Sequence, residues 1–467
     1  MKHLILSFFF ITLGILAKSQ NRFDIIIGDD DKNEHPSFVF QNSDNDFIIG
    51  AREGSRGTGI LIKLSNSGEV LLTHEWGLQD TIIFPVEYIQ LENSFISISL
   101  IRPDSGHANV MLFTEYNYQF EILEEYRFIF PIEGGYFKKI HIIKNSNNNL
   151  VCAGSYKYGE TDGAFIYKCT LKGDSINYST YTGGVNISDI DEINDTDEYL
   201  LTGKGFFYYF GYAEIIKTDS NFNIDTVFTV HDPYNFPENW SFLEFVSDST
   251  FLWYTKYYNG HSNSTNIITS LIDTSFNILE QISLNEDKDK FLPGFSWEFR
   301  NNTNIYIGAN LIFDAPTDFI LSKINSNLDV YWEKYYETDY MFFFTNILGT
   351  EDGGCLLLAE TIKNSKWAIR AVKVDSDGSV NISQNFTAHE TIVYPNPGSS
   401  QLKVRTAVQS LGGIFNLYTM SGKQVLQQQI TNRLTELNTQ NLPQGVYIFE
   451  YTLNNKVHES GKWILRR

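Results

Sequence analysis

Short apolar runs and alternating apolar and polar residues fill most of this chain, and polar turns separate them. Typical runs are residues 46–50 (DFIIG), 149–154 (NLVCAG) and 304–308 (NIYIG). Such runs, rich in Ile, Val and Phe and bounded by turn residues, predict β-strands. The spacing of an amphipathic helix is absent over any useful length. The pattern therefore predicts an all-β protein.

A six-residue turn pattern follows an apolar strand seven times along the chain. The copies begin at Ser65, Asn117, Leu171, Asp219, Asp273, Asn325 and Asp375, with spacings of 48 to 54 residues. About four strands and their turns fit into one such repeat. Four-stranded units repeated around an axis are typical of a β-propeller. We expect residues 21–384 to form a propeller with seven blades, and the drift between copies also allows six or eight.

The last copy carries a motif that can be compared with a known family. Residues 352–354 (DGG) precede an apolar strand, after which come Lys373, Asp375 and Gly378. This order resembles the degenerate propeller repeats of secreted Bacteroidetes proteins. Lysines recur two residues before the turns, and we expect them to face outward. They are Lys63, Lys217, Lys323 and Lys373.

The first residues have the pattern of a secretory signal. Lys2 and His3 precede an apolar run over residues 4–17, and Ala17 and Ser19 place small side chains where a signal peptidase needs them, with Gln20 next. Residues 1–19 are therefore predicted to be a signal peptide, too short to span a membrane. No later stretch approaches the roughly 18 apolar residues of a membrane-spanning helix. We expect no transmembrane segment in the mature protein.

The C-terminal part of the chain differs in charge and spacing. After a polar linker at 385–390, short strands alternate with turns over 391–467, which predicts a small Ig-like β-sandwich. These last residues include eight basic and three acidic side chains, a net +5, whereas the rest has 27 basic and 53 acidic side chains, a net -26. This contrast supports a domain boundary near residue 390. The acidic surface of the larger part argues against nucleic acid or anionic lipid as its partner.

Two motifs in the tail indicate an export route. They comprise Tyr394, Pro395, Asn396 and Pro397, then Leu442, Pro443, Gly445 and Tyr447, with Lys462 in the closing strand. A plain fibronectin-like module would explain the strands but not both motifs. The tail resembles the type A C-terminal sorting domain of the type IX secretion system. That resemblance implies passage from the periplasm across the outer membrane by the type IX machinery, removal of the tail and, often, attachment to surface lipopolysaccharide. We therefore expect a secreted or outer-membrane surface protein.

The sequence contains no specific catalytic or metal-binding motif. Signatures of serine hydrolases, zinc proteases and nucleotide-binding loops are missing, and no cofactor is expected. Calcium is the alternative at residues 375–378 (DSDG), 29–31 and 189–192, where an ordinary turn or solvated loops are the simpler interpretation. Cys152 and Cys169 lie on neighbouring predicted strands. A disulfide and two buried free thiols are the alternatives there.

Aromatic density is the remaining signal for a ligand. Rings that open onto a face could stack on sugars, although packing between blades accounts for most rings of a propeller. The candidate ligand contacts are Tyr208, Tyr209, Trp253, Tyr257 and Trp332. We predict a non-enzymatic exported propeller that binds an unknown glycan or protein partner. The alternatives are a structural envelope adhesin and a polysaccharide hydrolase or lyase, which would gather carboxylates and a histidine at the axial opening.

Overall fold

The computed structural model of the chain describes residues 22–54, 57–77, 81–103, 110–129, 135–182, 186–207, 210–230, 235–259, 264–283, 295–310, 318–338, 341–380 and 386–466. The predicted signal peptide and its cleavage site lie outside these residues. Within them, strands dominate, and one three-residue helix, η1 (Val408–Ser410), is present. No helix of this described part is long and apolar enough to cross a membrane.

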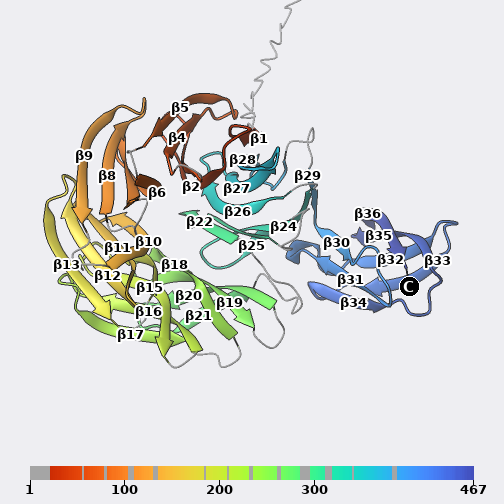
Figure 1. Cartoon of the computed structure of the whole chain (residues 1–467). Coiled ribbons are helices and arrows are strands. Elements are labelled where there is room, and N and C mark those ends of the chain that lie inside the picture. Colours follow the sequence, from red (N-terminus) through yellow and green to blue (C-terminus); the bar gives the residue numbers. More distant parts are fainter. Residues whose placement is uncertain are drawn as a thin grey trace, which may run out of the picture.

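Up to His389, the described residues form seven antiparallel sheets arranged around a common axis (Figure 1). We name them blades 1 to 7. Blade 1 contains β2 (Glu34–Gln41), β3 (Phe47–Glu53), β4 (Gly59–Leu64) and β5 (Val70–Trp76); blade 2 contains β6 (Thr81–Gln90), β7 (Ser94–Pro103), β8 (Val110–Asn117) and β9 (Ile122–Ile129). Blade 3 contains β10 (Gly135–Lys144), β11 (Asn149–Tyr158), β12 (Thr161–Thr170) and β13 (Ser175–Thr182); blade 4 contains β14 (Asn186–Glu192), β15 (Tyr199–Phe207), β16 (Phe210–Thr218) and β17 (Ile224–Val230).

The remaining three blades complete the ring. Blade 5 contains β18 (Asn235–Ser247), β19 (Thr250–Asn259), β20 (Ser264–Asp273) and β21 (Ile278–Ser283). Blade 6 contains β22 (Phe295–Asn301), β23 (Asn304–Asn310), β24 (Phe319–Ile324), β25 (Val330–Thr338) and a fifth strand, β29 (Phe386–His389). Blade 7 contains β26 (Phe343–Gly349), β27 (Cys355–Lys363), β28 (Lys366–Val374) and β1 (Asp24–Ile27). These sheets confirm the predicted propeller class.

A hydrophobic core lies between each pair of neighbouring blades and packs them together, including blades 7 and 1. The ring is also closed by its first strand, because β1 pairs with β28 as the outer strand of blade 7. In this pairing Arg370 Nε donates to Asp24 Oδ1 at 2.7 Å, and the two side chains are only 4% and 3% exposed. The strand after the predicted signal peptide therefore joins the last blade of the propeller.

The recurring turn pattern has one backbone geometry. In the fourth copy, Asp219 N donates to Asn223 O and Phe222 N donates to Asp219 O, both at 3.0 Å. The Asp219 carboxylate also accepts from the backbone N–H of Asn223 at 2.8 Å, which explains the Asp, Asn, Ser or Thr at the first position. Phe222 has a φ of 67°, a conformation that favours glycine in other copies. In the third copy the turn begins at Thr170 and not at Leu171 as predicted, because the Thr170 hydroxyl supplies the capping oxygen.

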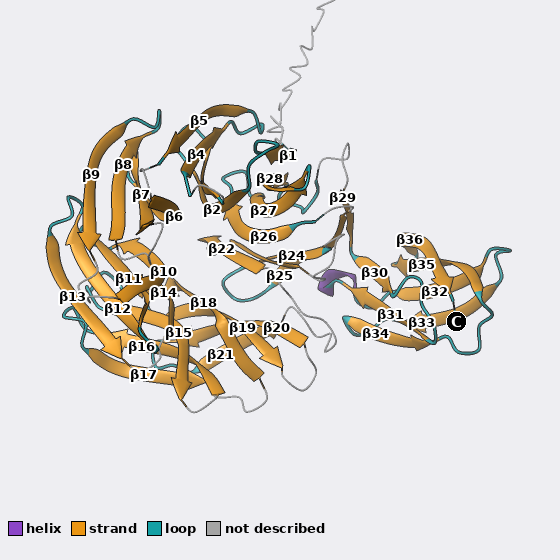
Figure 2. Ribbon diagram, in the orientation of Figure 1, coloured by secondary structure: helices purple, strands orange, loops and turns teal. Residues whose placement is uncertain are grey.

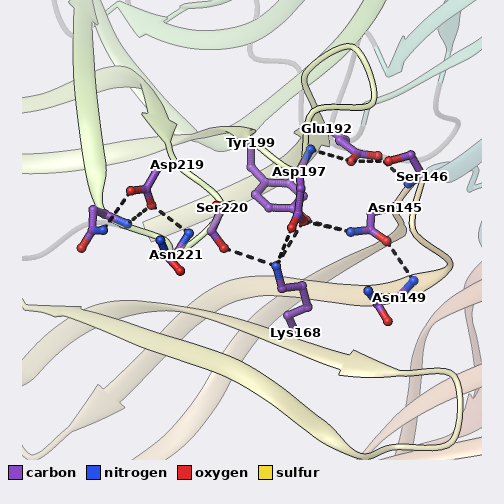
Figure 3. Close-up of polar contacts among 11 residues, drawn as sticks. Asn145, Ser146, Asn149, Lys168, Glu192, Asp197, Tyr199, Asp219, Ser220 and Asn221 are labelled. Atoms are coloured by element: carbon purple, nitrogen blue, oxygen red, sulfur yellow. Dashed lines mark hydrogen bonds and ion pairs between the residues drawn. The ribbon is translucent and has the colours of Figure 1, made fainter.

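The recurring lysines are not all outward-facing. The prediction is wrong for Lys323 and Lys373, which are 8% and 2% exposed. Lys373 Nζ lies 2.9 Å from Oδ2 of Asp352, so the first residue of the DGG motif pairs with the lysine of the same blade. Lys168 instead reaches the next blade, where its Nζ lies 2.9 Å from Asp197 Oδ2 (Figure 3). A long aliphatic stem lets each lysine lie along a buried strand while its ammonium group reaches a turn.

The three cysteines are free and buried. Cys152 and Cys169 do not lie opposite each other, because Cys152 pairs with Tyr167 and Cys169 pairs with Leu150 across β11 and β12. Both side chains belong to the core between blades 2 and 3. Of the two alternatives drawn from the sequence, the structure therefore has the free thiols.

The C-terminal unit is a two-sheet sandwich, as predicted. One sheet contains β30 (Thr391–Tyr394), β31 (Gln401–Thr406) and β34 (Leu434–Asn438); the other contains β32 (Ile414–Thr419), β33 (Gln424–Gln429), β35 (Gly445–Leu453) and β36 (Lys456–Leu465). Residues 386–389, expected to belong to a linker, form β29 and pair with β25 of blade 6. The chain thus passes from the propeller into the sandwich through a strand.

Candidate functional site

The aromatic residues singled out from the sequence do not form a site among the described residues. Trp253 is buried between blades 4 and 5, where its Nε1 donates to Ser241 Oγ at 2.8 Å. Trp332 is buried between blades 6 and 7. Tyr208 and Tyr209 lie outside the described residues, and Tyr257 belongs to β19, where its side chain is not described. The two tryptophans serve packing between blades.

The innermost strands of the blades surround a cavity of about 530 Å³. Its lining comes from β2, β6, β10, β18, β22 and β26, with Leu100 of β7, and includes Glu87, Lys139, His141, Trp297 and Glu298. A second hollow of about 520 Å³ shares Glu87 and continues along β6, β10 and β14. Polar side chains of widely separated repeats therefore meet at the propeller axis.

A β-bulge in an inner strand helps to build this lining. The pairing of β10 with β11 shifts between Phe137 and Lys139, so that both Lys138 and Lys139 line the cavity. Gly154 lies opposite the bulge, where a Cβ atom would overlap the carbonyl oxygen of Lys139. Gly154, in the middle of β11, thus gives the bulge its room.

Titratable groups of three blades lie in contact in this region. His141 Nδ1 on β10 is 3.4 Å from Glu87 Oε1 on β6 and 3.9 Å from Asp189 Oδ1 on β14. Lys139 Nζ lies 5.7 Å from the centre of the Phe242 ring on β18. No sequence motif joins these residues into a cluster, although the acids at 189–192 stood out by themselves.

Two of the acids connect neighbouring inner strands. Asp189 Oδ2 accepts a hydrogen bond from Leu243 N at 2.9 Å, and Asp191 Oδ2 accepts one from Phe245 N at 3.2 Å. Both acids lie in β14, so the prediction of a solvated loop at 189–192 is wrong. Their carboxylates satisfy backbone donors of β18 that face the axis. Among the described residues, no group of three His, Cys, Asp or Glu side chains could hold a metal ion.

Burial determines the protonation of the cavity. Burial, reinforced by Asp189, raises the pKa of Glu87 to about 8, and burial raises the pKa of Glu298 to about 7. Burial also lowers the pKa of Lys139 to about 8 and holds the pKa of His141 well below its usual value. Near neutral pH, Glu87 holds a proton and His141 is a neutral imidazole. The cavity therefore carries less charge than its residue types suggest.

The raised pKa of Glu298 predicts a pH-dependent effect on stability. Native Glu298 keeps its proton up to about pH 7, whereas the unfolded carboxyl loses it near its usual pKa of 4.5. The native protein therefore binds more protons in this window, and this contribution to stability is lost as the pH rises. Because the side chain keeps contact with solvent, we expect Glu298→Gln to gain about 1 to 2 kcal/mol over the native chain between pH 5 and pH 8. Urea unfolding at both pH values measures this difference.

A matched control is Glu124→Gln, which removes an exposed carboxylate on the outer strand β9. It is expected to shift the free energy of unfolding by less than about 0.5 kcal/mol at either pH. If the free energy of unfolding changed equally with pH in Glu298→Gln and in the native chain, Glu298 would not keep its proton in the folded protein.

In the sandwich, the first tail motif is joined to the closing strand. Asn396 Nδ2 donates to the Lys462 carbonyl at 2.8 Å, and Asn396 Oδ1 accepts from Ile464 N at 2.9 Å. Trp463 Nε1 donates to the Pro395 carbonyl at 2.8 Å. The asparagine between the two prolines thus acts as a side-chain extension of the sheet beside β36.

The second tail motif contacts the same strand. Tyr447 is 3% exposed, and its ring centre lies 5.9 Å from that of Trp463. Its hydroxyl donates to the Pro443 carbonyl at 2.5 Å, and Leu442 packs against the core of the sandwich. The two motifs, separated by more than forty residues in the sequence, therefore form one structural unit around Trp463.

Residues 392–466 match the family model described as the secretion system C-terminal sorting domain. A search of curated proteins found no match to the chain. Similar solved structures include an acylaminoacyl peptidase in complex with a chloromethyl ketone (8% identity, 80% of this chain, 58% of that chain, TM-score 0.45). The β-propeller domain of the trilobed protease from Pyrococcus furiosus (7% identity, 76% and 98%, TM-score 0.42) and a member of the DUF4221 family from Bacteroides vulgatus (11% identity, 79% and 99%, TM-score 0.36) are also similar. The tail is thus a type IX sorting domain, which implies export to the cell surface or the medium.

Proposed function

We propose that this protein is an exported propeller that binds a glycan in its axial cavity without cleaving it. The sorting domain directs the chain through the type IX machinery. Attachment to surface lipopolysaccharide, which the resemblance of the tail implies, would keep the propeller at the outer face of the cell. There its cavity would meet extracellular polysaccharides.

The mixed lining of the cavity carries this proposal. Sugar hydroxyls donate and accept hydrogen bonds, and the cavity offers both kinds of partner in Glu87, Glu298 and Lys139. His141 Nε2 is buried and makes no hydrogen bond within the described part of the chain. Trp297 adds an aromatic surface, which suits the apolar face of a sugar. The volume also falls within the roughly 300 to 1,000 Å³ of small-ligand pockets.

A glycan array probed with the chain without its predicted signal peptide, residues 20–467, tests the proposal. We expect binding of a defined set of oligosaccharides, with the affinity then measured by titration calorimetry. Glu298→Ala and Lys139→Met should each weaken binding by about tenfold or more, because each removes a side-chain group that would hydrogen-bond to the sugar inside the cavity. Glu124→Gln on the outer strand β9 is the control and should bind like the native chain. Failure to bind any glycan would overturn the proposal and favour the structural adhesin.

A polysaccharide hydrolase is the second candidate, and the contacts of His141 favour it. Glu87 and Asp189 flank this histidine, and a carboxyl with a pKa of about 8, as in Glu87, can act as a general acid near neutral pH. Incubation with a bound polysaccharide separates the two candidates. Release of new reducing ends that Glu87→Gln abolishes would establish hydrolysis, whereas binding without release supports the non-enzymatic proposal.

A further inference from the structure

The sorting domain lies against blade 6 (Figure 1), and β29, the strand that leads into it, continues the sheet of that blade. β29 pairs antiparallel with β25, from Thr338 opposite Phe386 to Tyr335 opposite His389. This is the geometry by which an extended segment adds a strand to an exposed sheet edge. Blade 6 has five strands, whereas each other blade of the described residues has four. The chain that leaves the propeller therefore covers the edge of its own sixth blade.

The same edge is occupied further along β25 by a side chain. Gln409 Oε1 accepts from Glu333 N at 3.1 Å, and Gln409 Nε2 donates to Glu333 O at 2.8 Å. Gln409 belongs to η1, the short helix where the sandwich meets blade 6 (Figure 2). Its amide group replaces the two backbone hydrogen bonds that another strand would form. These two hydrogen bonds thus fix the position of the sorting domain along β25.

An ion pair lies at the centre of this contact. The Glu333 side chain is fully buried and is bound by Arg433 of the sorting domain, by the Tyr335 hydroxyl at 3.0 Å and by Ser322 Oγ at 3.2 Å. Arg433 Nη1 also donates to the carbonyl of Ser283, the last residue of β21 in blade 5, at 2.7 Å. One arginine therefore joins the sorting domain to two blades.

Apolar and aromatic contacts surround the ion pair. Ala407 is buried within the core between blades 5 and 6, and Ile392 packs against it. The guanidinium of Arg405 lies 5.9 Å from the centre of the Tyr335 ring. An edge strand, a buried ion pair and a shared core are the components of a stable interface, and none of them depends on a covalent link.

We propose that the sorting domain is a docked cap of blades 5 and 6, which stays bound when the chain between the two domains is cut. Its contacts, and not the connecting peptide, hold it in place. The cap protects the β25 edge and the buried carboxylate of Glu333 until it is lifted away. Removal of the tail after export then needs dissociation of this interface in addition to cleavage of the chain.

The experiment uses the chain without its predicted signal peptide. The recognition sequence of a site-specific protease is inserted immediately before β29, in the peptide that connects the two domains. After cutting, we expect the fragment that begins with β29 to co-elute with the propeller in size-exclusion chromatography at micromolar concentration. Arg433→Met should weaken this association by about thirtyfold or more, because it leaves Glu333 buried without its charge partner. Lys456→Met, at an exposed position of the sandwich, is the matched control and should leave the association unchanged.

Two outcomes would overturn the proposal. One is separation of the fragments of the native sequence after cutting, while circular dichroism shows both folded. The other is an Arg433→Met fragment that binds as tightly as the native one. Should Arg433→Met prevent folding, Gln409→Ala removes only the two contacts to the β25 backbone and is expected to weaken binding several-fold. A Gln409→Ala affinity equal to that of the native fragment would equally contradict the docked cap.

Discussion

Replacing Arg370 with alanine is expected to lower the free energy of unfolding of the mature protein by about 3 to 5 kcal/mol. The guanidinium makes two bonds to the Asp24 carboxylate, and both side chains are almost fully buried. The variant would leave the carboxylate of Asp24 without its charge partner in the strand pair that closes the ring. Urea unfolding followed by tryptophan fluorescence measures the change.

A surface ion pair provides the control for this prediction. Arg127 Nη2 lies 3.4 Å from Glu125 Oε1, and both side chains are largely exposed. Arg127→Ala should therefore cost less than about 1 kcal/mol. The double variant Asp24→Asn with Arg370→Met should recover part of the lost stability, because it removes the unpaired charge. A loss in Arg370→Ala no larger than in Arg127→Ala would mean that β1 does not hold the ring closed.

The propeller could be predicted because its signals are local and repeated. Each hairpin turn needs a side-chain oxygen at its first position and a residue with a positive φ three positions later, as Asp219 and Phe222 show. Because of these requirements, every copy has recognisable residue types at these two turn positions. The tail could be predicted for a different reason, since its motif residues Asn396 and Tyr447 make specific contacts within a small sandwich.

The axial cluster could not be predicted, because it depends on how the blades are placed around the axis. Glu87 and His141 are 54 residues apart in the sequence, and His141 and Asp189 are 48 apart. Each lies in an inner strand of a different blade. Only the packing of blades 2, 3 and 4 side by side brings the three side chains together. Residue type alone therefore suggested scattered charges and, for Asp189, a solvated loop.

The pairing of β29 with the edge of blade 6 could not be predicted from the sequence either. Residues 386–389 are too few to give a strand pattern and were expected to belong to a linker, yet they form β29 because β25 presents an open edge. The two ends of the propeller thus contribute outer strands to adjacent blades, β1 to blade 7 and β29 to blade 6. The strand that closes the ring and the strand that leads into the docked tail therefore lie on adjacent blades.

Deletion of residues 391–467 is expected to leave nearly all of the protein in the periplasm. The sorting domain is the part of the chain that the type IX machinery recognises. Immunoblots of periplasmic and extracellular fractions measure the distribution. Since the deletion also uncovers blade 6, Arg433→Met is the control. This variant disturbs the docking contact but keeps both tail motifs, so the protein should still be exported.

Asn396→Ala removes the two hydrogen bonds to β36 and should reduce export. Efficient export of the deleted chain would show that another segment carries the sorting signal.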